Sequence, residues 1–156
     1  MANDGVYTDD PSEAVEFLRD KVLGRKMMGG SWVEFRPFTL TLGPGHLGLA
    51  RSQAANRMDI AAIPRVAIGP AKHKQVQVRV IPPQGRSPAE VEQALQTAGI
   101  DTRGGQVGKA AYLLGLPPET PPEQFVALAQ QSILAQGVAP GQAWQWIKRG
   151  GDQIPE

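Results

Sequence analysis

Apolar and polar residues alternate most regularly over residues 75–81, where three valines occupy every second position between two glutamines and an arginine. Because successive side chains of a strand point to opposite faces, this period of two predicts a strand with one buried face and one wet face of amide and guanidinium groups. The apolar run 65–68 lies just before it, across the segment 69–74 with its glycine and proline. Together the two runs predict a β-hairpin.

A second alternating pattern covers residues 32–42, but its phase shifts at Pro37. Proline has no N–H to donate to a neighbouring strand. We therefore expect a bulge or bend at Arg36 and Pro37, where the strand lies at an edge of the sheet or bends to switch neighbours. A short helix over residues 52–58 is expected to follow, and Pro64 prevents a longer one.

The N-terminal segment has helical spacing instead. Asp10, Pro11 and Glu13 are the residue types expected at the cap, the first position and the third position of a helix. Apolar residues then recur three and four positions apart, which predicts an amphipathic helix over residues 11–23. A glycine-rich break near residue 30 separates this helix from the alternating region.

Beyond residue 86 the pattern again predicts helices. Ser87, Pro88 and Glu90 match a capping box with proline at the first position, so one helix is expected to begin there. Three more helices are expected, over residues 106–114, 122–135 and 143–148. The sequence therefore predicts an α+β fold with an N-terminal helix, a small antiparallel β-sheet with a short crossing helix, and a C-terminal bundle of short helices.

Charge is distributed unevenly along the chain. Residues 1–28 carry four cations and six acids, residues 29–86 carry eight and two, and residues 87–156 carry four and seven, although the formal net charge is only +1. We therefore distinguish three parts of the chain, an N-terminal helical segment (1–29), a basic β-rich module (30–86) and a C-terminal helical subdomain (87–156). Since a local surplus of Lys and Arg attracts phosphates or acidic surfaces, the middle module is the candidate contact surface.

Nucleic acid is the partner that this basic module predicts. Cations contact phosphates, and Gln or Arg side chains hydrogen-bond to base edges. The candidate contacts lie in and beside the helix 52–58, in the hairpin loop and on the wet strand face: Arg51, Arg57, Lys72, His73, Lys74, Gln77 and Arg79. The pattern does not distinguish DNA from RNA or single strands from duplexes.

The alternative is a protein–protein interaction or structural assembly subunit. Such a protein would be a homo-oligomer or a component of a larger particle. The basic module of one copy would then meet the acidic C-terminal part of a neighbour, which suits a head-to-tail contact.

No catalytic or metal site is expected. The chain has no cysteine, which excludes thiol chemistry and Cys-ligated metals. Its two histidines, His46 and His73, have no carboxylate at the spacing of a metal site or a catalytic triad. Residues 104–109 are one residue short of a phosphate-binding loop, and Ala110 stands where such a loop has Ser or Thr. We therefore expect a protein that is not an enzyme and uses no cofactor.

Residues 108–116 have a pattern of small and apolar residues that is typical of the first helix of a helix-turn-helix. A recognition helix beginning near residue 121 would carry acids and no Lys or Arg, so phosphates would repel it. We expect an ordinary helical hairpin there instead. The polar, acidic N-terminus and the lack of an apolar run long enough to span a bilayer favour a cytoplasmic location with no membrane contact.

Overall fold

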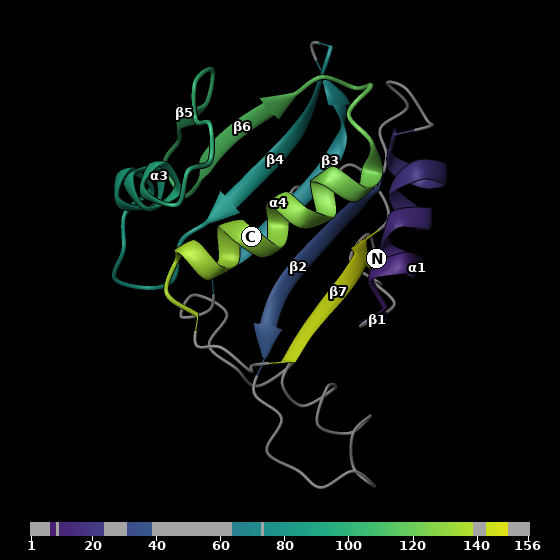
Figure 1. Cartoon of the computed structure of the whole chain (residues 1–156), viewed down its shortest axis with the longest axis horizontal. Coiled ribbons are helices and arrows are strands. Elements are labelled where there is room, and N and C mark those ends of the chain that lie inside the picture. The colour runs from purple at the N-terminus through teal and green to yellow at the C-terminus, as the bar shows by residue number, and fades with distance from the viewer. Residues whose placement is uncertain are drawn as a thin grey trace, which may run out of the picture.

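The computed structural model describes residues 7–8, 10–23, 31–38, 64–72, 74–138 and 143–149. Within them, seven strands form one antiparallel sheet in the order β1-β7-β2-β3-β4-β6-β5 (Figure 1). The strands are β1 (Tyr7–Thr8), β2 (Trp32–Phe38), β3 (Arg65–Lys72), β4 (Gln75–Ile81), β5 (Gln106–Val107), β6 (Tyr112–Leu116) and β7 (Ala143–Arg149). The helices are α1 (Pro11–Phe17), the π-helix η1 (Leu18–Leu23), α3 (Pro88–Thr97) and α4 (Pro122–Ala135). The sheet takes strands from all three of the parts that differ in charge.

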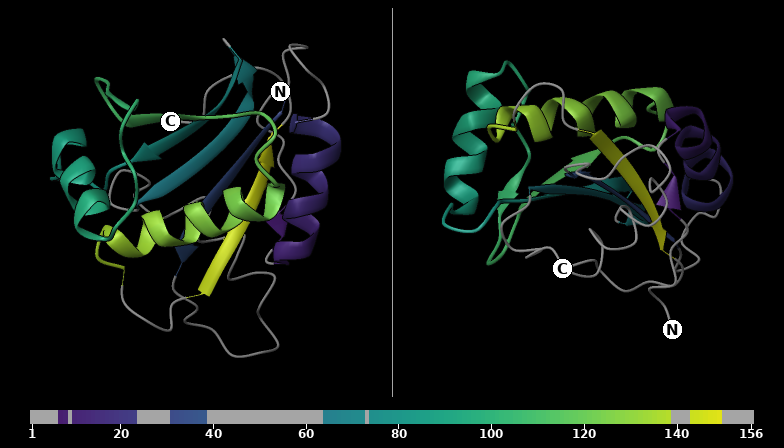
Figure 2. Two further views of the ribbon diagram at one scale, coloured as in Figure 1. Left: turned by 45° about the horizontal axis from the view of Figure 1, so that its top comes forward. Right: turned by 90° about the horizontal axis from the view of Figure 1, so that it is seen from below.

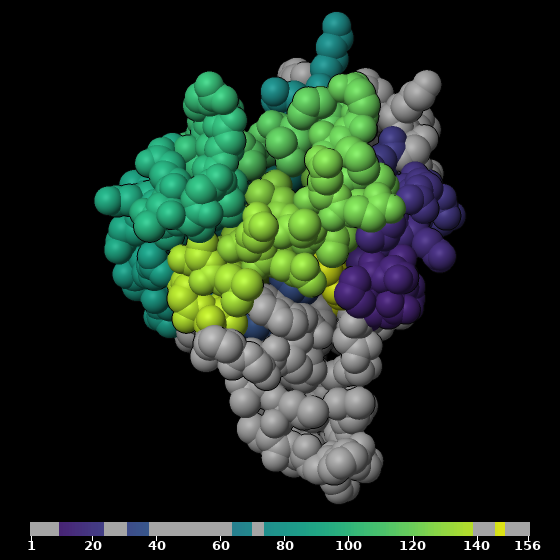
Figure 3. All heavy atoms as spheres, viewed as in Figure 1, coloured from purple at the N-terminus to yellow at the C-terminus, as the bar shows by residue number. Residues whose placement is uncertain are grey.

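All the described helices lie on one face of the sheet (Figure 2). Helix α4 crosses the central strands diagonally, with α3 at one end and α1 at the other, and the three helices lie side by side in the space-filling view (Figure 3). The structure therefore has two layers, helices over an antiparallel sheet. The predicted mixture of helices and strands, the N-terminal helix and the antiparallel sheet are confirmed.

The helix starts follow the predicted capping residues. The Asp10 carboxylate accepts a hydrogen bond from the Ser12 N–H at 3.0 Å, and the chain is helical over the predicted residues 11–23. At the start of α3, the Ser87 hydroxyl accepts from the Glu90 N–H at 3.2 Å and the Glu90 carboxylate accepts from the Ser87 N–H at 2.9 Å. The hydrogen bond from the Ser87 N–H favours the ionised carboxylate and is the largest cause of the lowered pKa of Glu90. The capping box is therefore confirmed.

The predicted hairpin is confirmed as β3 and β4. Their register pairs Val66 with Val80 and shifts after Ile68, where β3 has a bulge. Lys74 takes a positive φ of 63° in the turn. The valines of β4 are buried and alternate with its more exposed polar residues, as the period of two predicted.

Two of the predicted C-terminal helices are strands in the structure. Residues 106–114 contain β5 and part of β6, and residues 143–148 belong to β7. The predicted bundle is therefore wrong, although the helix over 122–135 is confirmed as α4. Strand β6 pairs with β4, and strand β7 pairs with β2. Hydrogen bonds to strands that are distant in the sequence therefore decide the structure of these short apolar runs. The predicted helix over 52–58 lies outside the described residues.

Strand β2 lies inside the sheet, between β7 and β3. Its pairing with β3 covers Val33 to Phe35, whereas its pairing with β7 continues to Phe38. Pro37 pairs with Trp144 of β7 and has no partner on its other side among the strands that the structure describes. Strand β2 as a whole is therefore an inner strand, but at Pro37 it is an edge on one side, as the sequence predicted, and the missing N–H of Pro37 is tolerated there.

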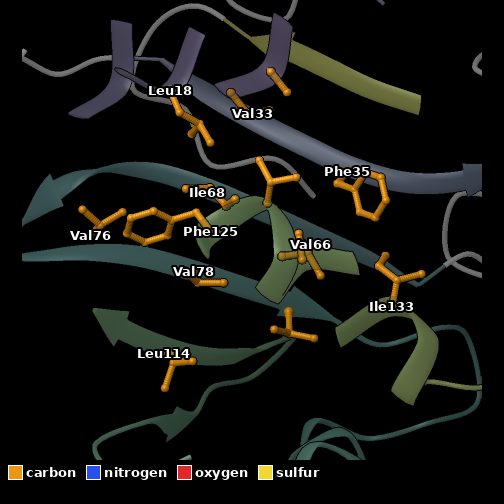
Figure 4. Packing of buried hydrophobic residues seen from close by; sticks show 14 of the residues in the cluster. Leu18, Val33, Phe35, Val66, Ile68, Val76, Val78, Leu114, Phe125 and Ile133 are labelled. Carbon is orange, nitrogen blue, oxygen red and sulfur yellow. The ribbon is translucent and has the colours of Figure 1, made fainter. Parts of the chain in front are cut away.

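An apolar core fills the space between the sheet and the helices (Figure 4). On the sheet side, Phe35 of β2 packs against Trp146 of β7, with ring centroids 4.1 Å apart. On the helix side, Phe125 of α4 lies fully buried over β3 and β4. Strand β7 is also joined to the helix layer, because Lys148 forms a 2.5 Å ion pair with Glu13 of α1.

Tyr112 anchors the short β5–β6 hairpin. Its side chain is fully buried, and its hydroxyl donates a hydrogen bond to the Thr102 carbonyl at 2.7 Å. Gly105 makes this packing possible, because a Cβ at that position would collide with the Tyr112 hydroxyl. Burial disfavours the phenolate and raises the pKa of Tyr112.

The raised pKa of Tyr112 should make stability sensitive to alkali. Since the unfolded chain loses this proton first, the Tyr112 contribution is lost as pH rises from the unfolded value of 10.0 through the higher folded pKa. We expect Tyr112→Phe to cost about 1 kcal/mol at neutral pH for its lost hydrogen bond, and this deficit to shrink above pH ~10. Urea unfolding of both proteins across that pH range measures the difference. A deficit that stays constant would contradict the expectation.

Candidate functional site

The face of the sheet turned away from the helices carries the alternate residues of each strand, and we name it the second face (Figure 2, right). Its described residues include Trp32, Glu34 and Arg36 of β2, Arg65, Ala67 and Gly69 of β3, Gln75, Gln77 and Arg79 of β4, and Leu113 and Gly115 of β6. The opposite face supplies the apolar core. The second face is polar and cationic, so it is where chemistry beyond packing is to be sought.

The part of the second face on β2 and β3 is buried. The exposed fractions of Glu34, Arg36 and Arg65 are 0%, 3% and 4%. A guanidinium nitrogen of Arg65 donates to a carboxylate oxygen of Glu34 at 3.0 Å, which forms a buried ion pair across neighbouring strands. Trp32 is also buried there, and its ring occupies the space where a Cβ on Gly69 would lie.

The part of the second face on β4, β6 and β5 is open to solvent. A hollow of about 180 Å³ is lined there by Gln75, Gln77, Gly104, Gln106, Leu113, Leu114 and Gly115. Gly115 lies beneath the Gln75 side chain, because a Cβ at Gly115 would overlap the Gln75 amide. Three carboxamide groups therefore meet around one recess, with Leu113 as its apolar wall.

The structure brings together some of the predicted contact residues. Lys74 is exposed in the hairpin turn, and Gln77 and Arg79 lie half-buried on the second face of β4. Lys72 ends β3 in register with Gln75. Arg51, Arg57 and His73 lie outside the described residues, so their part in the site stays a prediction.

Sequence reasoning missed the β5–β6 side of the recess. Gln106 and Leu113 pair across these two strands, but both fell within the helix expected over 106–114. The available signal was the shortness of the apolar run from Tyr112 to Leu116, which is shorter than a typical helix and fits a strand.

Positive charge predominates in the strands β3, β4, β5 and β6. Residues 60–89 contain five Lys and Arg and no acid, and residues 102–118 contain Arg103 and Lys109 and no acid. Two of these cations are paired with acids outside the two stretches, Arg65 with Glu34 and Arg103 with Asp101. The remaining cations give this surface a positive field that attracts phosphate or carboxylate groups.

Other chemistries find no support in the described residues. Residues 104–109 contain strand β5 where a phosphate-binding loop would open a helix. Residues 108–116, the first helix of the helix-turn-helix pattern, contain strand β6 and no helix. No group of three His, Cys, Asp or Glu in the described part of the chain could hold a metal ion. Among the helices that the structure describes, none is long and apolar enough to cross a membrane.

Comparison with known proteins gives no relative: the chain matches no family model, no curated protein and no solved structure. The fold and site together define a mixed α/β protein with one helix-covered sheet face and one polar, cationic sheet face. A function must therefore be inferred from the residues of that second face.

Proposed function

We propose that the protein binds nucleic acid without catalysing a reaction, through the open β4–β6 part of the second face. The observation that supports this proposal is the recess lined by Gln75, Gln77 and Gln106. A carboxamide both donates and accepts hydrogen bonds, which matches the mixed donors and acceptors of base edges. Leu113 adds an apolar surface for the body of a base.

Cations beside the recess supply the phosphate contacts. Arg79 lies two residues beyond Gln77 on the same face of β4, and Lys74 lies in the turn just before Gln75. Since no acid occurs in residues 60–89, these strands offer no carboxylate of their own to repel a phosphate backbone.

A recess favours an unpaired base over a duplex. The bases of a duplex present their edges only inside a groove, whereas an unpaired base can turn its edge into a pocket. We therefore propose single-stranded DNA or RNA as the first ligands to test, with duplex DNA as the comparison.

Charge removal at the recess should weaken binding and flatten its salt dependence. We expect the double variant Lys74→Ala/Arg79→Gln to lose about tenfold in affinity, and the slope of log affinity against log salt to fall by roughly 0.7 for each lost contact to a single strand. Fluorescence anisotropy of labelled oligonucleotides at several salt concentrations measures both quantities.

The matched control is Lys21→Ala, which removes an exposed lysine from η1 in the helix layer. Its affinity and salt slope should equal those of the wild type. Unchanged binding in the double variant would show that the site is misplaced, and no binding of any nucleic acid by the wild type at low salt would refute the proposed function.

One observation favours assembly as a second candidate function. Val107 on the outermost strand β5 is 49% exposed, and Leu113, which pairs with Gln106 from the neighbouring strand β6, is 38% exposed. A short outer strand with exposed apolar residues can pair with another chain. Light scattering over a wide range of protein concentration tests self-association, and a monomer at every concentration would exclude a homo-oligomer.

A further inference from the structure

Arg36 is a charged residue of the second face that the proposed function does not use. It lies on β2 and is only 3% exposed, and its Nε atom is buried without a hydrogen-bond partner. Among the described residues it forms no ion pair. The nearby carboxylate of Glu34 is engaged by Arg65 at 3.0 Å.

The surroundings of Arg36 add positive charge. Arg65 begins β3, the strand next to β2, and Arg79 lies one strand further on the same face, with its own Nε buried and without a hydrogen-bond partner. On β2, β3 and β4, the side chains that the structure describes on this face therefore include three guanidinium groups and one carboxylate. Arginine cannot relieve this excess by losing a proton, because the guanidinium group stays protonated in proteins.

A buried charge without a partner is unfavourable, and an anion is the partner that would relieve it. The planar guanidinium presents parallel N–H donors that match two oxygens of a phosphate or carboxylate group. We propose that the buried part of the second face binds a small free oxyanion of the phosphate type, with Arg36 as its main ligand and Arg65, held in place by Glu34, beside it.

This proposal does not depend on the proposed nucleic-acid function. Arg36 is buried, whereas Lys74 and Gln75 of the recess are exposed. A polymer lying along the open strands would not bring its phosphates to Arg36, because that side chain is only 3% exposed. The two sites are therefore separable by mutation.

The test compares the wild type with Arg36→Met, in which a side chain of similar length replaces the charge. Thermal unfolding is followed in sodium phosphate and in sodium chloride of equal ionic strength. We expect inorganic phosphate to raise the unfolding temperature of the wild type saturably, as mass action requires of a ligand of the folded state, and to have a smaller, unsaturable effect on Arg36→Met. In chloride, Arg36→Met should be at least as stable as the wild type, because no unpaired charge remains buried.

Phosphate also stabilises proteins generally by exclusion from their surface, so an equal shift in both proteins, or no shift, would overturn the proposal. A second variant, Arg36→Lys, keeps the charge and loses the two-pronged donor, and it should bind phosphate more weakly in isothermal titration calorimetry. Equal phosphate affinity of Arg36→Lys and the wild type would also overturn the proposal. Oligonucleotide binding by Arg36→Met should stay at the wild-type level. If Arg36→Met lost oligonucleotide binding together with phosphate binding, the anion bound by Arg36 would be a backbone phosphate of a nucleic acid, and the proposal of a free anion would be overturned.

Discussion

Replacing Glu34 with alanine should lower the free energy of unfolding by about 3–5 kcal/mol, because the change leaves the buried guanidinium of Arg65 without this carboxylate. The two side chains are 0% and 5% exposed, and their ion pair is 3.0 Å long. Water cannot replace the lost charge at such a depth. Arg36 is buried on the same face, so the variant would keep two buried arginines and remove the carboxylate of Glu34. Urea denaturation at neutral pH measures the loss.

The double variant Glu34→Leu/Arg65→Met separates the cost of a broken pair from the value of the intact pair. Removing both charges should recover most of the stability, since buried ion pairs are often replaceable by apolar residues of similar volume. The control Glu16→Gln, at an exposed position of α1, should change stability by less than about 0.5 kcal/mol. A Glu34→Ala variant as stable as this control would show that the pair is not buried as described.

Phe125→Ala should lower the free energy of unfolding by about 3–5 kcal/mol, because it removes the aromatic side chain by which α4 packs on the sheet. Phe125 is fully buried, and its ring lies beside Val76, Val78 and Ile68 of the central hairpin (Figure 4). The lost stability has two parts: the free energy gained by burying the ring, and the unfavourable cavity that remains beneath the helix. Chemical denaturation monitored by circular dichroism measures the change.

Leu134→Ala is the matched control on the same helix. Leu134 is 48% exposed, so its truncation should alter stability by about 0.5 kcal/mol or less. Because α4 and the recess lie on opposite faces of the sheet, folded Phe125→Ala should bind oligonucleotides as the wild type does. A cost equal to that of Leu134→Ala would contradict the described core.

Local signals predicted the elements whose stabilising contacts are also local. The β3–β4 hairpin joins neighbouring residues, and its alternation of valine with polar residues is regular. The caps at Asp10 and Ser87 act within three residues, so their residue types were sufficient. In each case the interacting partners lie close together in the sequence.

Strand β7 shows where such reasoning fails. Trp144 and Trp146 are two positions apart, which on a helix directs them to different faces and on a strand to one face. The choice of strand is made by β2, more than a hundred residues earlier, whose Phe35 packs against Trp146. No local pattern contains that information.

The candidate site divides in the same way. The residues of β4 were predicted from its own alternation, whereas the buried group of Glu34, Arg36 and Arg65 was not. Glu34 and Arg36 alternate with the apolar Val33 and Phe35, and charged residues in such positions are usually exposed. Their burial at 0% and 3% is a tertiary property, so the least expected part of the site is the part that depends most on the whole fold.

The position of β7 between β1 and β2 has a consequence for how the chain acquires its structure. During synthesis, β2, β3 and β4 emerge early and can pair with one another, but the other side of β2 must wait for residues 143–149. Pairing across so long a separation is slow, because a large loop must close before its contacts form. Until then the nascent sheet presents a row of unpaired N–H and C=O groups, the feature by which incomplete sheets aggregate. This stage would be the one at which a chaperone matters most.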